Sequence, residues 1–202
     1  MKKYLVLILC ICYASYSAAQ DDEFRTIFKR NGDKNIKITA FGGPMMEFTS
    51  VGNDFCHMMG GGGALMIGNT FFGGYGFGKT NSTSYKYDPN YRLNYGYGGL
   101  WMGYVIAPNA PVHLSLSGQM GWGAISKAQK FPDGNLQNIE SQSVFVLTPI
   151  AEVEFNFSRL FKLGIGASYN WVTGEGITNT PYTTNDLSKP AIYMSFKFGW
   201  FH

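Results

Sequence analysis

The sequence has 202 residues, a formal net charge of +3, and a composition that is 16% aromatic but only 14% charged. Soluble globular domains average about 25% charged residues, so this chain is short of the charge that a fully hydrated surface needs. The small net charge also excludes the basic stripe that phosphate binding requires, and we expect no nucleic-acid partner.

The N-terminus has the features of a secretory signal peptide. Two lysines precede an apolar run from Leu5 to Cys12, and small residues at 17–19 offer a cleavage site after Ala19. The run is too short to span a bilayer, and bulky residues before its cysteines argue against a lipid anchor. Cleavage would lower the net charge to +1 and leave Cys56 as the single cysteine, so no disulfide is expected within the mature chain. We predict a signal peptide over 1–19, a short periplasmic leader over 20–33 and one domain over 34–202.

From residue 34 onward, apolar and polar residues alternate in eight segments, as they do along β-strands. In the last segment, Ile192, Met194 and Phe196 share one face, while Ser195 and Lys197 share the other. No apolar run after the signal peptide approaches the about 18 residues of a membrane-spanning helix. The predicted strands are 34–48, 54–68, 70–80, 91–106, 112–125, 143–157, 161–173 and 191–202.

An even number of half-apolar strands in a charge-poor secreted chain predicts an all-β fold, an eight-stranded antiparallel up-and-down transmembrane β-barrel. The connections favour the same fold, because short turns alternate with long polar loops. In such barrels the short turns face the periplasm and the long loops face outside, so we expect the chain in the outer membrane, with lipid around it. A secreted β-sandwich is the alternative, but its outer faces would carry more charge. The expected turns are 68–70, 107–111 and 158–160, the expected long loops are 80–90, 126–142 and 174–190, and 49–53 is a short exception.

Aromatic residues are expected at both edges of the membrane-spanning region, as the girdles of such barrels. With the first strand running outward, Trp101 and Trp200 fall near the periplasmic rim, and Trp122 and Trp171 near the outer rim. The residues expected to join them are Tyr91, Tyr95 and Tyr169 at the outer rim, and Phe71, Tyr104, Phe155, Phe157 and Phe161 at the periplasmic rim.

The alternation also assigns side chains to the lumen. An eight-stranded barrel has an interior only wide enough for side chains, and buried charges persist only when they are paired. We therefore expect a polar plug in which Lys37, Arg92 and Lys197 neutralise Glu47, Glu152 and Glu154. Further inward residues are Asn94, His113, Gln119 and Lys162, and the expected outward set is Ile38, Leu65, Tyr75, Tyr97, Leu116, Val153 and Ile165.

In pattern and topology, residues 34–202 resemble the small eight-stranded outer-membrane barrels of Gram-negative bacteria, such as the OmpA transmembrane domain, OmpX and the OmpW group. Phe198 and Trp200 stand at alternating aromatic positions of the closing strand, which resembles the signal read by the outer-membrane assembly machinery. The resemblance implies that machinery as a partner. His202 departs from it, because the family usually ends in Phe.

Three functions are open at this point. The first is a non-enzymatic structural or partner-binding barrel that acts through its long loops, for example as an accessory subunit of an envelope complex. The second is an OmpW-like channel for small apolar molecules. The inward apolar residues that favour it are Phe41, Met45, Met58 and Met66.

The third function is a lipid A acyl hydrolase, because His113 and Ser115 share a strand face as a base and a nucleophile would. Barrels of the PagL kind carry such a pair facing the membrane near the outer rim, whereas His113 follows a periplasmic turn and points inward. The glycine runs 60–63 and 73–78 lie within strand patterns and lack the Lys-Ser/Thr of a phosphate loop. We expect no catalytic site, no cofactor and no metal.

Overall fold

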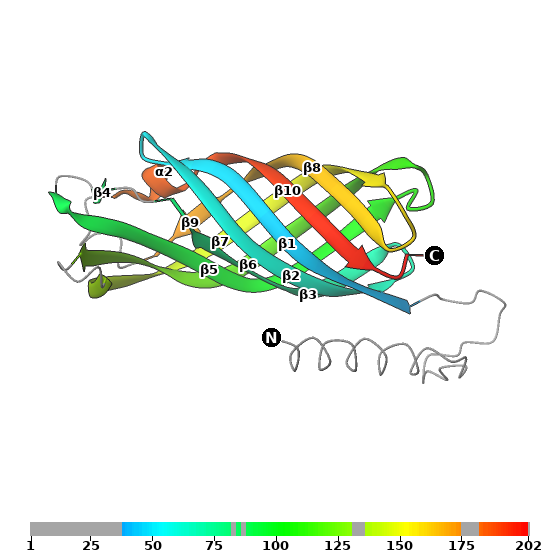
Figure 1. Ribbon diagram of the computed structural model, residues 1–202, viewed down its shortest axis with the longest axis horizontal. Helices are drawn as coiled ribbons and strands as arrows, with labels where there is room; N and C mark the ends of the chain where they lie inside the picture. The colour runs from blue at the N-terminus through cyan, green and yellow to red at the C-terminus, as the bar shows by residue number, and fades with distance from the viewer. Residues whose placement is uncertain (1–37, 82–83, 86–87, 131–135, 175–181, 202) are drawn as a thin grey trace, which may run out of the picture. The chain divides into compact units, whose positions relative to one another are not determined.

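The computed structural model describes residues 38–81, 84–85, 88–130, 136–174 and 182–201. The predicted signal peptide, the leader and Lys37 lie outside the described residues. Most of the described part is β-strand (Figure 1). In chain order the elements are β1 (Ile38–Val51), β2 (Asp54–Ile67), β3 (Thr70–Lys79), β4 (Ser84–Tyr85), β5 (Asp88–Ile106), β6 (Val112–Lys130), β7 (Leu136–Asn156), β8 (Phe161–Tyr169), β9 (Trp171–Thr173), the short helix α2 (Thr184–Leu187) and β10 (Pro190–Gly199).

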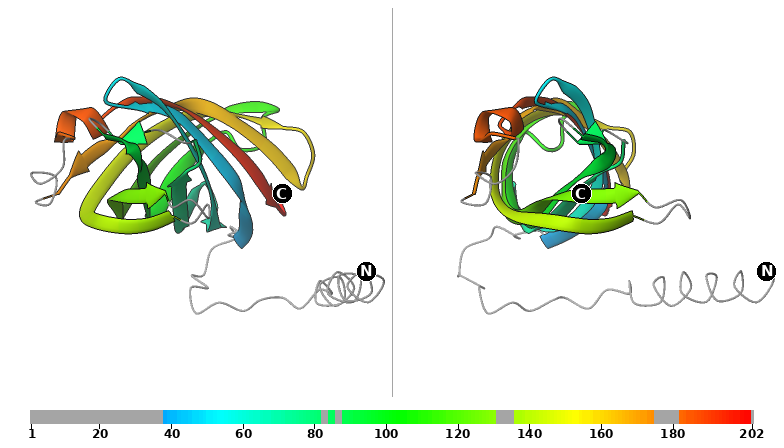
Figure 2. Two further views of the ribbon diagram at one scale, coloured as in Figure 1. Left: turned by 60° about the vertical axis from the view of Figure 1, so that its left-hand side comes forward. Right: turned by 90° about the vertical axis from the view of Figure 1, so that its left-hand side faces the viewer.

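Eight long strands form a closed antiparallel ring. Each of β1, β2, β3, β5, β6, β7, β8 and β10 pairs with the next, and β10 pairs back with β1. The two short strands, β4 and β9, add to β5 and β7. Figure 2 shows the ring from its end. The predicted eight-stranded antiparallel barrel is confirmed.

The predicted strand 161–173 is interrupted at Asn170. β8 and β9 pair with β7 in one continuous register on either side of the break. In this register Thr148 lies opposite Asn170 and Pro149 lies opposite Tyr169, next to the break; because proline has no N–H, Pro149 cannot donate to the ladder. The Asn170 N–H donates instead to the carbonyl of Lys189, at 3.0 Å. The break therefore fastens this strand to the segment that leads into β10.

The predicted loop 126–142 is mostly strand, which corrects the expectation. β6 continues to Lys130 and β7 begins at Leu136, with Ser126 paired to Ser141 and a bulge between Lys127 and Ala128. Residues 88–95 of β5 also run past the last partner in β3. Together, residues 88–95, 124–130 and 136–144 extend beyond the ring as three paired strands, with the short β4 added along β5, and are named here the outer projection (Figure 1, at the left).

The two faces of the ring have opposite character. Glu47, Glu152, Glu154, Lys162 and Lys197 are each at most 3% exposed and point into the lumen. On the outer face every ring strand presents apolar side chains, which is the arrangement of a barrel surrounded by hydrocarbon. The large exposed ones include Ile38, Leu65, Phe72, Leu100, Met102, Leu116, Val153, Ile165, Ile192 and Phe198. No helix among the described residues is long and apolar enough to cross a membrane.

Candidate functional site

A cluster of charges crosses the lumen near the short-turn end. The Lys197 ammonium donates to Glu154 Oε1 at 2.6 Å and also to Glu152 Oε1. The Ser195 hydroxyl donates to the second oxygen of Glu152 at 2.8 Å, and His113 Nε2 lies 2.9 Å from the second oxygen of Glu154. All four carboxylate oxygens are thus occupied. We call these five residues the charge cluster.

Three aromatic rings close around the same ammonium. Lys197 Nζ lies 5.6 Å from the ring centroids of Phe41 and Phe71, and 5.3 Å from that of Trp101. The rings meet edge to face, with Phe71 and Trp101 centroids 4.9 Å apart. Cations within about 6 Å of an aromatic face are attracted to it, so the rings supplement the two carboxylates. They also fill the lumen at this level.

The position of Trp101 corrects the expected girdle. Trp101 is 1% exposed and Phe71 is also 1% exposed, so neither faces the membrane. Tyr95, expected in the outer ring, is 5% exposed and also points inward. By contrast, the structure places three tryptophans on the outer surface: Trp122, Trp171 and Trp200, with 67%, 50% and 57% exposure.

Glu47 has neutral partners rather than the expected cation. It accepts hydrogen bonds from the Tyr97 hydroxyl at 2.7 Å, the Ser168 hydroxyl at 3.0 Å and the Asn170 amide at 2.8 Å. Within the described ranges, no Lys, Arg or His nitrogen lies within ion-pair distance of it. The expected pairing of Glu47 with Arg92 is not seen, and Lys37 lies outside the described residues.

The prediction that Arg92 points into the lumen is wrong, for a physical reason. On β5 the odd positions point inward, so Tyr97 lies in the lumen and Arg92 and Asn94 lie on the other face. Tyr75 on β3 is likewise inward, 8% exposed, although it was expected outside. Arg92 belongs to the outer projection, beyond the ring, where it is half-buried and a charge on the outer face can reach water.

The histidine and serine of the hydrolase alternative do not form a catalytic pair. Both ring nitrogens of His113 are occupied, because Nδ1 lies 3.1 Å from the Ala110 carbonyl and Nε2 lies 2.9 Å from Glu154. The Ser115 hydroxyl is fully buried and has no hydrogen-bond partner among the described residues. A nucleophile needs a base within hydrogen-bond reach and a path for its substrate. This lumen arrangement provides neither for an acyl chain.

Sequence reasoning missed the contact between His113 and Glu154. The two residues are directly paired across β6 and β7, which makes the contact a consequence of hairpin register. The described residues hold no group of three or more His, Cys, Asp or Glu side chains placed to bind a metal ion.

At the outer end, the described part of loop 174–190 is fixed to the barrel. Tyr182 and Leu187 are each 3% exposed and belong to the buried apolar cluster. Thr183 caps α2 through a reciprocal capping box with Asp186, and the Asp186 carbonyl accepts a hydrogen bond from the Gly52 N–H at 2.8 Å. Residues 182–189 therefore serve as a structural cover over β1 and β9.

Comparisons with known proteins agree with this architecture. No family model matches the chain, and no curated protein matches it in sequence. Among solved structures, Neisserial surface protein A is similar with a TM-score of 0.53 at 11% identity, covering 82% of this chain and 97% of that one. Two structures of Ail, the attachment invasion locus protein of Yersinia pestis, have TM-scores of 0.44 at 13% and 14% identity, covering 80% of this chain and 96% of theirs; the 13% match is a complex with a heparin analogue, sucrose octasulfate. The chain thus has the fold of the small eight-stranded outer-membrane β-barrels.

Proposed function

We propose that this chain is a non-catalytic outer-membrane barrel that binds a protein partner of the envelope or the cell exterior through its outer projection. The observation that carries the proposal is the extension of β5, β6 and β7 past the ring, because those residues are not needed to close the barrel. Along β7, residues 136–144 have β6 as their only strand partner among the described residues. An open strand edge is a ready template for pairing with another polypeptide.

The lumen supports a scaffold role better than a channel. The Lys197 cluster, Trp101 and Phe71 fill it near the short-turn end, and Tyr193 and Met45, each at most 2% exposed, fill it farther along. Phe41, Met45, Met58 and Met66 do face inward, as the channel alternative requires, but they are packed among these rings. Planar-bilayer recordings should therefore show no stable conductance, and a steady open channel would restore the channel alternative.

Binding is tested by photo-crosslinking in intact cells. A photoreactive phenylalanine analogue replaces Tyr91 in the outer projection, and the matched control replaces Tyr104 at the opposite end of β5. Polypeptide adducts are expected from the Tyr91 position and not from the Tyr104 position.

A shortened chain provides the second arm. Replacing residues 128–139 by Asn-Gly would join Lys127 and Glu140, which are paired across β6 and β7, through a two-residue turn. The shortened barrel should still change its gel mobility on heating and should lose the adducts at Tyr91. Adducts that persist unchanged would show that the partner does not need the β6–β7 part of the projection, residues 128–139.

A further inference from the structure

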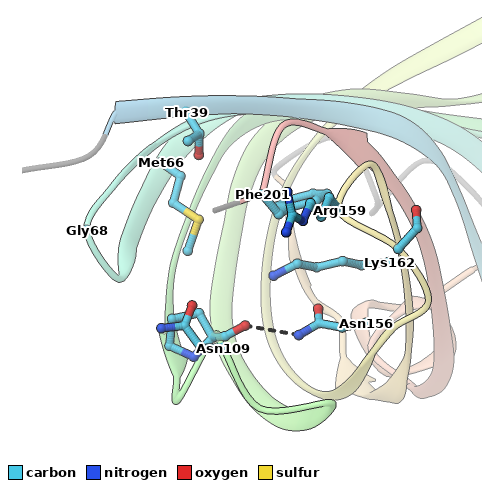
Figure 3. A pocket seen from close by; sticks show the side chains of 10 residues that line it. Thr39, Met66, Gly68, Asn109, Asn156, Arg159, Lys162 and Phe201 are labelled. Carbon is cyan, nitrogen blue, oxygen red and sulfur yellow. Dashed lines mark hydrogen bonds between the residues drawn. The ribbon is translucent and has the colours of Figure 1, made fainter.

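A cavity of about 610 Å³ lies at the short-turn end of the barrel, opposite the outer projection (Figure 3). Its wall comes from the start of β1, the three short turns, the start of β8 and the segment after β10. This size suits a small ligand rather than a single ion. The lining residues are Thr39, Met66, Gly68, Pro108, Asn109, Asn156, Ser158, Arg159, Lys162 and Phe201.

Lys162 is a buried cation without a hydrogen-bonding partner in the described structure. Its side chain is 3% exposed, and its ammonium lies 4.3 Å from the ring centroid of Phe201. The charge of Glu154 acts on it, but the two oxygens of Glu154 are already bonded to Lys197 and His113. Buried ammonium groups are costly unless they are paired and hydrogen-bonded. Figure 3 shows Lys162 directed into the cavity.

Two further groups complete the polar lining. Arg159 also lines the cavity and forms no ion pair with a carboxylate of the described ranges, while its carbonyl accepts from the Phe201 N–H at 2.9 Å. The Asn156 side-chain amide donates to the carbonyls of Pro108 and Ala110, at 3.0 and 2.7 Å, which fixes its orientation. Its Oδ1 is buried without a donor among the residues described. The cavity therefore offers two cations and one free acceptor.

We propose that this cavity binds the free carboxylate end of a short peptide. The carboxylate would accept from Lys162 and Arg159, and the last amide N–H would donate to Asn156 Oδ1. The terminal side chain would pack against Phe201 and Met66. This inference concerns the opposite end of the barrel and does not depend on the proposed partner of the outer projection.

Isothermal titration calorimetry on the full mature chain in detergent tests the site. The probes are N-acetyl-Ala-Ala as the free acid and the same peptide as its C-terminal amide. Only the acid should bind, because each charge-assisted hydrogen bond contributes about 1.5–3 kcal/mol, or about tenfold or more in Kd. N-acetyl-D-Ala-D-Ala is titrated in parallel. Tighter binding of this D-alanine peptide would assign the ligand to cell-wall peptide, and tighter binding of the L-alanine peptide would assign it to protein.

Variants separate the site from general charge. Lys162→Met keeps the apolar stem and should raise the Kd of the peptide acid by about tenfold or more. Arg159→Gln should also weaken it, while Lys127→Met in the outer projection should not. Equal binding of acid and amide, or competition by inorganic phosphate at the same affinity as the acid, would overturn the peptide assignment.

A spectroscopic measurement locates binding in the unmutated protein. With methyl-labelled methionines, the acid should shift the resonance of Met66, which lines the cavity, and leave Met59, which lies on the outer face with 41% exposure, unchanged. A shift at neither methionine in the presence of saturating acid would overturn the proposal even if a variant failed to fold.

Discussion

Replacing Lys197 by Met should be among the most destabilising single changes in the lumen. Lys197, Glu152 and Glu154 are 3%, 0% and 1% exposed, so the ammonium and both carboxylates are removed from water. Methionine fills a similar volume but leaves Glu152 with only the Ser195 hydroxyl and Glu154 with only His113. Removing one member of a buried ion pair typically costs about 3–5 kcal/mol, because the partner keeps an uncompensated charge. The folded-to-unfolded ratio should fall by about two to four orders of magnitude.

A neutral triple variant distinguishes the ion pairs from simple packing. Lys197→Met combined with Glu152→Gln and Glu154→Gln removes all three charges, and it should recover most of the lost stability, since neutral replacements of buried ion pairs are often tolerated. Asp54→Asn, at an exposed strand end, is the control and should stay within about 0.5 kcal/mol. The assay is equilibrium unfolding in guanidinium of the barrel folded into liposomes, followed by tryptophan fluorescence and by heat-dependent gel mobility. Lys197→Met with native stability, or a triple variant worse than the single one, would refute the reasoning.

Three other predictions follow from the same structure. A Cβ on Gly123 would lie 2.0 Å from the Gly96 carbonyl oxygen, so Gly123→Ala should prevent normal folding, whereas Gly78→Ala, with nothing within 4 Å, should leave gel mobility unchanged. In a Cys56→Ser chain, a cysteine at Asn81 should react with an impermeant thiol reagent on intact cells and one at Asn109 should not; the reverse would mean an inverted barrel. A coupled fatty-acid release assay should detect no ester hydrolysis by the parent protein, and Ser115→Ala should fold normally and give the same result.

The strands could be predicted because their surroundings select a simple pattern. A strand that faces lipid on one side and a narrow lumen on the other needs apolar residues at every second position, and β10 shows this with Ile192 and Phe198 outside and Ser195 and Lys197 inside. The pairing of Lys197 with Glu152 and Glu154 also followed from this alternation, because buried charges require partners.

Which face of β5 points into the lumen could not be predicted, because both of its faces are apolar. Tyr97 and Trp101 point inward, whereas Leu100 and Met102 point outward with 43% and 40% exposure. Aromatic rings can fill the lumen or form the membrane girdle equally well. The residue types of β5 therefore do not show whether its odd or its even positions point inward. Charged side chains of a ring strand point into the lumen and away from lipid, which suggested that Arg92 points inward. This reasoning fails for Arg92 because β5 extends beyond the ring there.

The outer projection was missed for a related reason. Its strands are polar at most positions and lack the alternation of the ring strands, so the sequence predicts a loop over 126–142 and begins the strand of β5 only at residue 91. The sequence Pro132-Asp133-Gly134 is a turn signature that could have located the hairpin between β6 and β7. Extending a hairpin centred on residue 133 in unbroken register would place His113 opposite Val153, and the bulge between Lys127 and Ala128 shifts the pairing by one residue to Glu154.

In the membrane barrel described above, β10 faces hydrocarbon on one side and a closed lumen on the other. Nitroxide scanning from residue 192 to 198, in protein reconstituted into bilayers, tests this directly by comparing collisions with oxygen and with a water-soluble nickel chelate. We expect high oxygen and low nickel accessibility at 192, 194, 196 and 198, and low accessibility to both at 193, 195 and 197. Even-numbered positions that react more with the nickel chelate than with oxygen would place this face in water and contradict the membrane barrel.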